Sequence, residues 1–255
     1  MNGLLNLSKR ETMLLLAATL TSTSAHAAAA KKLRILAFGA SNTWGFQPVD
    51  AKERILRRLP FSQRWTGVAQ RALGPNFEIV EDALSGRTAG MDRPNVASSQ
   101  LPGSAYNGLT ELPEALARNV PLDLVVLQLG TNDLMLDPNL SAEALCQRLV
   151  TLCDIIKKFT LPIPLEGQAK PIKAMLMAPT TIGPMPNNPN WERAEATRKL
   201  ALPLLQAAGL EHGFSVFDGA EAVPTPGSDG LHFGVEAHRR LGALAAATIR
   251  EALRQ

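Results

Sequence analysis

Cysteine is nearly absent from this chain, with 2 among 255 residues. Cys146 and Cys153 are seven positions apart in a segment with helical periodicity, so about 10 Å of helix would separate their Cα atoms. A disulfide needs Cα atoms within about 7 Å of each other. The two residues are therefore predicted to be small buried apolar side chains that do not bridge, and no Cys/His metal-binding spacing is present.

The chain also lacks a large excess of charge, because its formal net charge is only +3 and aromatic residues make up 5% of it. The local arginine clusters have no interleaved rings on which nucleobases could stack, so we expect a solvated surface and no nucleic-acid partner. The H-E-x-x-H, P-loop and G-x-G-x-x-G motifs are missing, so no metal and no cofactor is expected.

No apolar run near the start is long enough to cross a bilayer, which takes about 20 residues. Lys9 and Arg10 instead precede a short apolar run at residues 13–20, and small residues then lead to an A-x-A pattern at residues 25–27. This order is typical of a secretory signal, and an amphipathic helix or a membrane anchor is the alternative.

The predicted organisation is a signal peptide at residues 1–27, cleaved after Ala27, and a single domain at residues 28–255. Hydrophobic residues make up 45% of the chain, which is enough for one substantial core without disulfides or metal. We therefore predict an exported protein, periplasmic or secreted, with no stable membrane insertion once the signal is removed.

Short aliphatic runs alternate with helical patterns along the rest of the chain. The runs are apolar almost throughout, as in a parallel sheet covered on both faces, so we predict a three-layer α/β sandwich with about five parallel strands. The expected strands are Leu33–Phe38, Phe77–Glu81, Leu124–Leu129, Ala174–Ala178 and Phe214–Phe217. The expected helices are Gln63–Leu73, Glu111–Arg118, Ala142–Lys158, Asn190–Glu211 and Val235–Leu253.

Ligands of open parallel sheets bind beyond the carboxyl ends of the strands, so the residues that follow each strand matter most. Ser41 follows the first strand in a glycine-containing turn at the start of a helix, where a helix N-cap is the simpler interpretation. Gly86 follows the second strand and Asn132 the third. Near the end of the chain, Asp229 lies three residues before His232, a spacing that suits an Asp–His pair.

Together these four segments resemble the SGNH (GDSL-type) hydrolase superfamily, in which Ser, Gly, Asn and His occur in this order. The resemblance spans about residues 33–250 and is closest to the bacterial arylesterase and acyltransferase branch, whose sequences are similar to residues 41–45, 64–68 and 121–124. It implies a flavodoxin-like sandwich fold and an enzyme that hydrolyses small-molecule esters without a cofactor.

The resemblance also implies a role for each motif residue. Ser41 would be the nucleophile, His232 the general base, and Asp229 the group that orients His232. The oxyanion hole would consist of the backbone amides of Ser41 and Gly86 and the side-chain amide of Asn132.

Two features near Ser41 depart from related patterns. Ala40 replaces the Asp that usually precedes the nucleophile, which removes a carboxylate that would support the loop. No G-x-S-x-G motif surrounds Ser41, because Thr43 occupies the second glycine position, and this argues against the α/β-hydrolase fold.

Three aromatic residues help to predict the substrate, because Trp44, Phe46 and Trp65 lie in or near segments expected to border the site. If they line it, short acyl groups such as acetyl on aryl or alkyl alcohols would fit best, whereas core packing is the alternative. A partly closed apolar pocket would also let an alcohol accept the acyl group. An acetylesterase of carbohydrate or cell-envelope polymers and a non-catalytic binding module remain open, as does a homo-oligomeric state.

Overall fold

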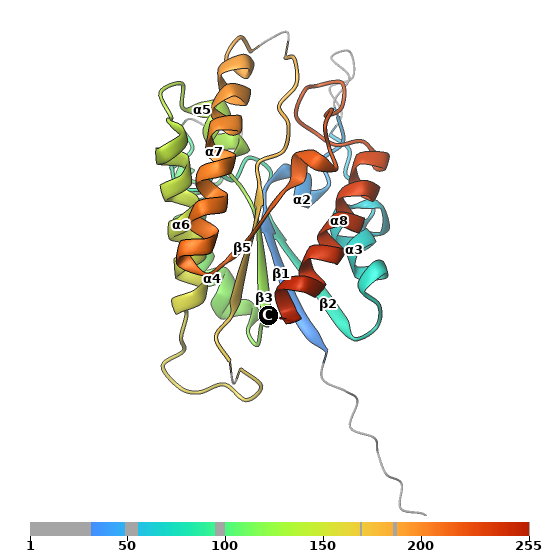
Figure 1. Cartoon of the computed structure of the whole chain (residues 1–255), viewed down its shortest axis with the longest axis vertical. Helices are drawn as coiled ribbons and strands as arrows, with labels where there is room; N and C mark the ends of the chain where they lie inside the picture. The colour runs from blue at the N-terminus through green and yellow to red at the C-terminus, as the bar shows by residue number, and fades with distance from the viewer. Residues whose placement is uncertain (1–31, 49–55, 95–99, 169, 186–187, 255) are drawn as a thin grey trace, which may run out of the picture. The chain divides into compact units, whose positions relative to one another are not determined.

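The computed structural model describes residues 32–48, 56–94, 100–168, 170–185 and 188–254 (Figure 1). These residues belong to one unit of the chain, and the predicted signal peptide at its start lies outside them. None of the helices in the described ranges has the length and apolar character needed to pass through a membrane.

Five parallel strands form the sheet, in the spatial order β2-β1-β3-β4-β5. Their ends differ from the predicted ones by two residues at most. The predicted sandwich around five parallel strands is therefore confirmed. The strands are β1 (Leu33–Gly39), β2 (Phe77–Ala83), β3 (Leu124–Gln128), β4 (Lys173–Ala178) and β5 (Ser215–Asp218).

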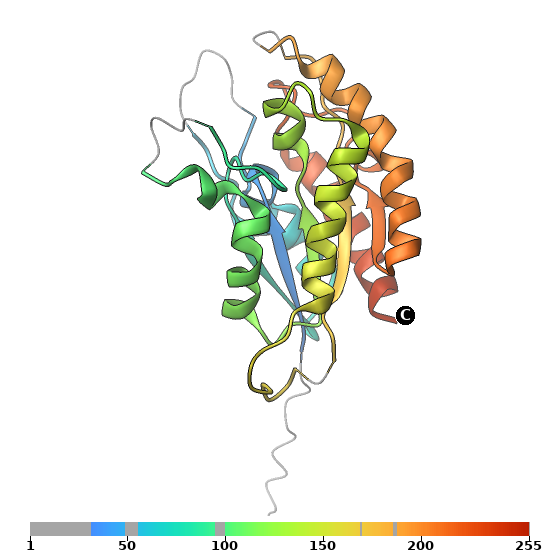
Figure 2. The same ribbon diagram turned by 90° about the vertical axis from the view of Figure 1, so that its left-hand side faces the viewer.

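Helices cover both faces of this sheet, and Figures 1 and 2 show the two helical layers on either side of it. The first layer contains α3 (Trp65–Leu73) and α8 (Val235–Arg254), which pack against each other and against one face. The second layer, on the opposite face, contains α4 (Gly108–Asn119), α6 (Ala142–Lys158) and α7 (Trp191–His212).

The interior strand β1 contributes to both cores because successive side chains of a strand point to opposite faces. Leu36 and Phe38 pack in the core beneath α4, α6 and α7, whereas Ile35 and Ala37 pack in the core beneath α3 and α8. All four side chains are fully buried. Burial of one large aliphatic side chain contributes about 1.5–3 kcal/mol, which explains why the run is apolar throughout.

Helix boundaries follow local capping. The predicted bounds of α6 are confirmed, and the Ser141 hydroxyl caps its first turn by accepting a hydrogen bond from the Ala144 amide at 3.1 Å. Helix α4 begins three residues earlier than predicted, at Gly108, because the Asn107 side chain caps it there. Helices α7 and α8 differ from their predicted bounds by one residue at most.

Both cysteines lie on α6 and are free, as their spacing predicts. Cys153 is fully buried in the core beneath α4, α6 and α7, and Cys146 packs against the same core. Burial raises the pKa of both thiols, so each stays protonated at neutral pH.

The strand order places a crevice at the carboxyl ends of β1 and β3. Strand β1 lies between β2 and β3, so the chain runs from β1 toward one edge of the sheet and then toward the other. Ligand sites of doubly wound sheets form at such a reversal. Two short helices begin there, α2 (Ser41–Trp44) after β1 and α5 (Thr131–Leu136) after β3.

Candidate active site

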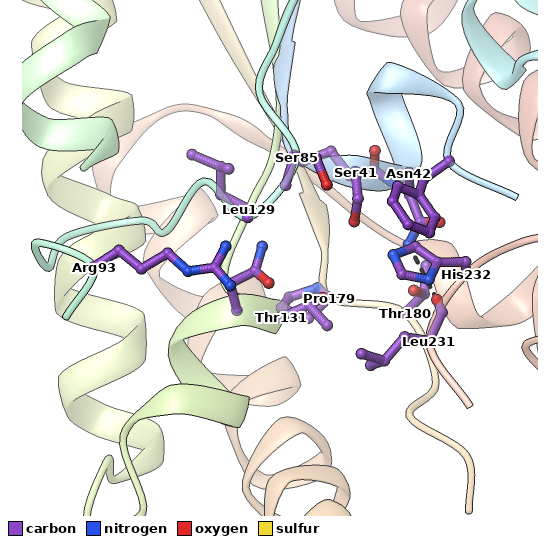
Figure 3. A pocket seen from close by; sticks show the side chains of 15 residues that line it. Ser41, Asn42, Ser85, Arg93, Leu129, Thr131, Pro179, Thr180, Leu231 and His232 are labelled. Atoms are coloured by element: carbon purple, nitrogen blue, oxygen red, sulfur yellow. Dashed lines mark hydrogen bonds between the residues drawn. The ribbon is translucent and has the colours of Figure 1, made fainter. Parts of the chain in front are cut away.

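Ser41 is the first residue of α2 and lines a pocket at the carboxyl end of β1 (Figure 3). Ala40 occupies the N-cap position and provides no side-chain cap, so the alternative of Ser41 as the N-cap is wrong. Within the described ranges, the Ser41 hydroxyl makes no hydrogen bond. This hydroxyl is therefore available to a molecule in the pocket.

His232 lies on the other side of the same pocket and is fixed by Asp229. The Asp229 Oδ2 atom is 2.7 Å from His232 Nδ1, and Oδ1 accepts hydrogen bonds from the backbone amides of Leu231 and His232 at 3.1 and 2.9 Å. Because Nδ1 is engaged, Nε2 is the ring nitrogen left to exchange a proton with a ligand.

The electrostatics of Asp229 match this arrangement. Burial by itself would raise the pKa of Asp229, but the hydrogen bond and charge of His232 and the two backbone amides outweigh it. The pKa of Asp229 is therefore well below its ordinary value, and the side chain remains a carboxylate that can stabilise an imidazolium.

Asn42 connects the two sides of the Ser–His pair. Its Oδ1 accepts a hydrogen bond from the Phe233 amide at 3.2 Å, and its Nδ2 donates to the Leu231 carbonyl at 3.2 Å. No hydrogen bond joins Ser41 to His232 among the described residues, and catalytic hydrogen bonds often shorten only when substrate binds. Asn42 thus fixes the spacing of α2 and the His232 loop, a role that the sequence analysis missed.

Three hydrogen-bond donors face the pocket beside Ser41. The backbone amides of Ser41 and Gly86 donate to no acceptor in the described part of the chain. Asn132 uses one amide hydrogen to bind the Arg87 carbonyl at 2.8 Å, which leaves its other hydrogen for a ligand. Gly86 has a φ of 89°, a conformation that glycine adopts without strain. These groups could together hold a negatively charged oxygen.

A buried carboxylate positions the loop that carries Gly86. Asp133, on α5, is fully buried and accepts hydrogen bonds from the backbone amides of Ala89 and Gly90 at 2.6 and 3.2 Å. Arg148 of α6 binds the same carboxylate at 3.0 Å. Burial raises the pKa of Asp133, and these three donors oppose that rise.

Arg87 supports the turn before Ser41, where Ala40 lacks the usual carboxylate. Its guanidinium binds Asp82 at 2.9 Å and donates a hydrogen bond to the Gly39 carbonyl at 3.2 Å. The guanidinium carbon Cζ also lies 4.1 Å from the centroid of the Phe38 ring. The ends of β1 and β2 are thereby joined directly before the pocket, so the loop has support without an acid at position 40.

The pocket has a volume of about 330 Å³, and the residues after β1, β2, β3 and β4 contribute to it. The motif residues Ser41, Gly86, Asn132 and His232 all line it. Asp229 does not line the pocket and contacts the His232 ring at Nδ1. No group of three or more His, Cys, Asp or Glu side chains suited to a metal occurs within the described ranges. The lining residues are Ala40, Ser41, Asn42, Phe46, Ser85, Gly86, Arg93, Gln128, Leu129, Thr131, Asn132, Pro179, Thr180, Leu231 and His232.

Of the three predicted ring residues, Phe46 lines the pocket and the two tryptophans do not. Phe46 stacks on the His232 imidazole with ring centroids 4.2 Å apart. Trp65 is fully buried, and its indole N–H points at Gln128 Oε1, 3.2 Å away, so core packing is its role. The Arg58 guanidinium instead lies over the Trp44 ring, with its Cζ atom 4.6 Å from the ring centroid.

A model of the GDSL-like Lipase/Acylhydrolase family matches residues 37–240. The chain belongs to this family. As a GDSL-like acylhydrolase it is a carboxylic ester hydrolase, and the resemblance to the SGNH superfamily is confirmed. No match is found among curated proteins.

Solved structures of related proteins agree with this family. The native aryl esterase of M. smegmatis is 31% identical, with a TM-score of 0.74 over 86% of this chain and 99% of that one. Est24, a carbohydrate acetylesterase from Sinorhizobium meliloti, is also 31% identical, with a TM-score of 0.75 over the same shares, 86% and 99%. A carbohydrate acetylesterase family member from Sinorhizobium meliloti, 23% identical with a TM-score of 0.76 over 88% and 100%, shows the fold alone.

Proposed function

We propose that this chain hydrolyses esters of short acyl groups, such as acetyl, with aryl or alkyl alcohols, through an acyl-enzyme at Ser41. One observation carries the proposal. The Asp229–His232 hydrogen bond of 2.7 Å lies beside a serine hydroxyl that has no described partner, in the same pocket as two unoccupied backbone amides.

The proposed reaction begins when Ser41 Oγ attacks the ester carbonyl carbon and His232 Nε2 takes the hydroxyl proton. Asp229 stabilises the imidazolium, and the three donors beside Ser41 bind the oxyanion of the tetrahedral intermediate. Collapse of the intermediate breaks the bond to the alcohol oxygen, which receives the proton from His232. Water then attacks the acyl-enzyme while His232 takes its proton. Collapse of this second intermediate breaks the bond to Ser41 Oγ, which receives the proton from His232, and the acid is released.

The size and lining of the pocket support a short acyl group. Its volume of about 330 Å³ is at the lower end of the range for small-molecule sites. Phe46, Leu129 and Leu231 provide apolar contacts, and Phe46 stands directly against the catalytic imidazole. A long fatty chain would need more apolar surface than this pocket offers.

The decisive test compares 4-nitrophenyl acetate hydrolysis by the wild-type protein and by Ser41→Ala. Removal of the nucleophile of such a triad costs about 10⁶ in kcat, so only background hydrolysis should remain. Ser85→Ala is a matched control, because this serine lines the same pocket without a proposed role. Unchanged hydrolysis by Ser41→Ala would contradict the proposal.

A second candidate function has a specific observation in its favour, the similarity to Est24 from Sinorhizobium meliloti. The chain would then remove acetyl groups from carbohydrate or cell-envelope polymers with the same residues. Acetate release from acetylated xylan or peptidoglycan, compared with that from 4-nitrophenyl acetate, distinguishes the two. Membership in an acylhydrolase family argues against a non-catalytic binding module.

Acyl transfer is an extension of the same chemistry. An alcohol that enters the apolar pocket would attack the acyl-enzyme in place of water. The expected result is a transester product beside the free acid when an alcohol is added in excess. Formation of the acid alone at every alcohol concentration would contradict acyl transfer and leave ester hydrolysis intact.

We also propose export of the protein, on the basis of the basic, apolar and small-residue segments that end at residues 25–27. Expression of the full chain in a bacterial host should yield periplasmic or secreted protein whose amino terminus is Ala28. Retention of the protein in the cytoplasm with residues 1–27 intact would contradict export.

A further inference from the structure

Arg93 is the one permanently charged residue among the described residues that line the pocket. Its guanidinium makes neither a hydrogen bond nor an ion pair with any described residue. Its backbone amide donates to the Gly103 carbonyl at 3.1 Å, and the guanidinium lies 5.5 Å from the centroid of the Tyr106 ring. The guanidinium is therefore held by contact with the Tyr106 ring, and no acceptor for its donors is present in the described part of the chain.

The other arginines near the site contrast with Arg93. Arg87 binds Asp82 at 2.9 Å, Arg148 binds Asp133 at 3.0 Å, and Arg64 binds Glu81. A charge that is withdrawn from water normally requires such a partner. The half-buried guanidinium of Arg93 lacks one within the described chain, so a bound molecule is the natural source of the missing anion.

Arg93 lies beside the proposed oxyanion hole. Its Nη1 atom lies so close to Gly86 that a Cβ atom added to this glycine would overlap Nη1. Figure 3 shows Arg93 and His232 entering the pocket from opposite sides, with Ser41 between them. If His232 protonates the leaving alcohol, as the proposed function states, the alcohol lies on the His232 side. The acyl group then extends toward Arg93.

We propose that Arg93 binds a carboxylate on the acyl part of the substrate. The preferred substrates are then monoesters of short dicarboxylic acids, such as malonyl or succinyl esters. This inference rests on the proposed function, since the orientation of the ester depends on His232. A planar guanidinium with free donors can bind a carboxylate through two parallel hydrogen bonds.

The test measures kcat/KM for monomethyl succinate and for methyl succinamate, in which a neutral amide replaces the carboxylate at nearly equal size. The wild-type protein should prefer the succinate by about 10- to 100-fold, the range expected for charge-assisted hydrogen bonds. Arg93→Gln should reduce this ratio to about one or less, and Arg93→Lys should retain part of it. The ratio is internal to each variant, so a general loss of folding or activity cancels.

Arg71→Gln is the matched control, because it removes one positive charge from the exposed side of α3 and should leave the ratio unchanged. A wild-type ratio of one or less, or an equal ratio in Arg93→Gln, would overturn the inference. A preference for acetoxyacetate over acetoxyacetamide that exceeds the succinate preference would place the anion on the alcohol and also overturn it. If the wild-type protein hydrolyses neither methyl succinamate nor 4-nitrophenyl acetate, the proposed function itself fails.

Discussion

The two walls of the pocket are built from different interactions. The His232 wall (residues 41–46 and 229–233) depends on neutral hydrogen bonds from Asn42, a ring stack, and one Asp–His pair. The Gly86 wall (residues 84–93 and 130–133) depends on charged groups, with Asp133 fully buried and bound to Arg148.

This difference corresponds to what each wall is proposed to do. A wall that moves protons needs a titratable group in contact with the pocket, and His232 lines it. A wall that supplies fixed backbone donors needs rigidity, because preorganised dipoles are effective only if they do not move. Loss of the proton-transfer groups of the His232 wall should therefore affect turnover most, and loss of the buried charge pair of the Gly86 wall should affect stability most.

Among the residues that support the nucleophile, the largest expected effect is on turnover in the His232 wall. Asp229→Asn should lower kcat for 4-nitrophenyl acetate by about 10⁴, because the imidazole loses its orienting and charge-stabilising partner. Steady-state kinetics measure this effect. Glu236→Gln, at the exposed start of α8, is the control and should leave kcat unchanged. A decrease of less than tenfold would mean that Asp229 does not orient the base.

Next in size is a stability effect in the Gly86 wall. Asp133→Asn should lower the free energy of unfolding by about 3–5 kcal/mol, because Arg148 and two backbone amides lose a buried carboxylate. Urea denaturation measures the change. Asp137→Asn removes the more exposed partner of the same arginine, 3.4 Å away, and should cost less than about 1 kcal/mol. Equal losses in the two variants would contradict the contrast between the walls.

Acid should lower the free energy of unfolding because of His238, a buried residue of α8. Its Nδ1 accepts a hydrogen bond from the Trp65 amide at 3.1 Å. Burial, together with the nearby charges of Arg64 and His232, lowers the pKa of His238 from 6.5 to about 4. Between these values the unfolded chain binds a proton that the folded chain excludes, so stability decreases as the pH falls. The full loss is on the order of 3 kcal/mol.

Unfolding curves in urea at several pH values from about 7 down to about 4 measure this decrease. His238→Gln is the informative variant, because glutamine can accept the Trp65 hydrogen bond but does not titrate. The variant should lose less stability over this range than the wild-type protein. Parallel curves for the two proteins would mean that other groups cause the acid sensitivity.

The smallest expected effect concerns the ring stack in the His232 wall. Phe46→Leu removes a ring whose centroid is 4.2 Å from that of the imidazole, a contact worth about 0.5–1.5 kcal/mol. The expected result is a decrease of about 2- to 10-fold in kcat/KM for 4-nitrophenyl acetate. Phe61→Leu, at a ring that is 41% exposed, provides the control. An unchanged kcat/KM in Phe46→Leu would show that stacking does not help to orient His232.

Much of the fold follows from short stretches of sequence. The aliphatic run at β1 predicts a strand buried on both faces, and the spacing of Asp229 and His232 predicts a pair that the structure shows at 2.7 Å. For Trp65 the alternative of core packing holds, since the residue is fully buried. Proximity in sequence to a motif does not say which face of a helix points to the core. Helix α5 was missed because 6 residues are too few for a helical period to be visible.

Local patterns specified the strands, the main helices and the motif residues, because hydrophobic period and turn chemistry act over a few neighbouring positions. The support of the site came from contacts between distant segments. Asn42 binds Phe233 across 191 positions, and Asp133 binds Ala89 across 44. Arg93 likewise becomes a pocket residue only because its loop folds against Gly86. Such pairings depend on how β1, β2 and β3 lie side by side, which no local pattern encodes.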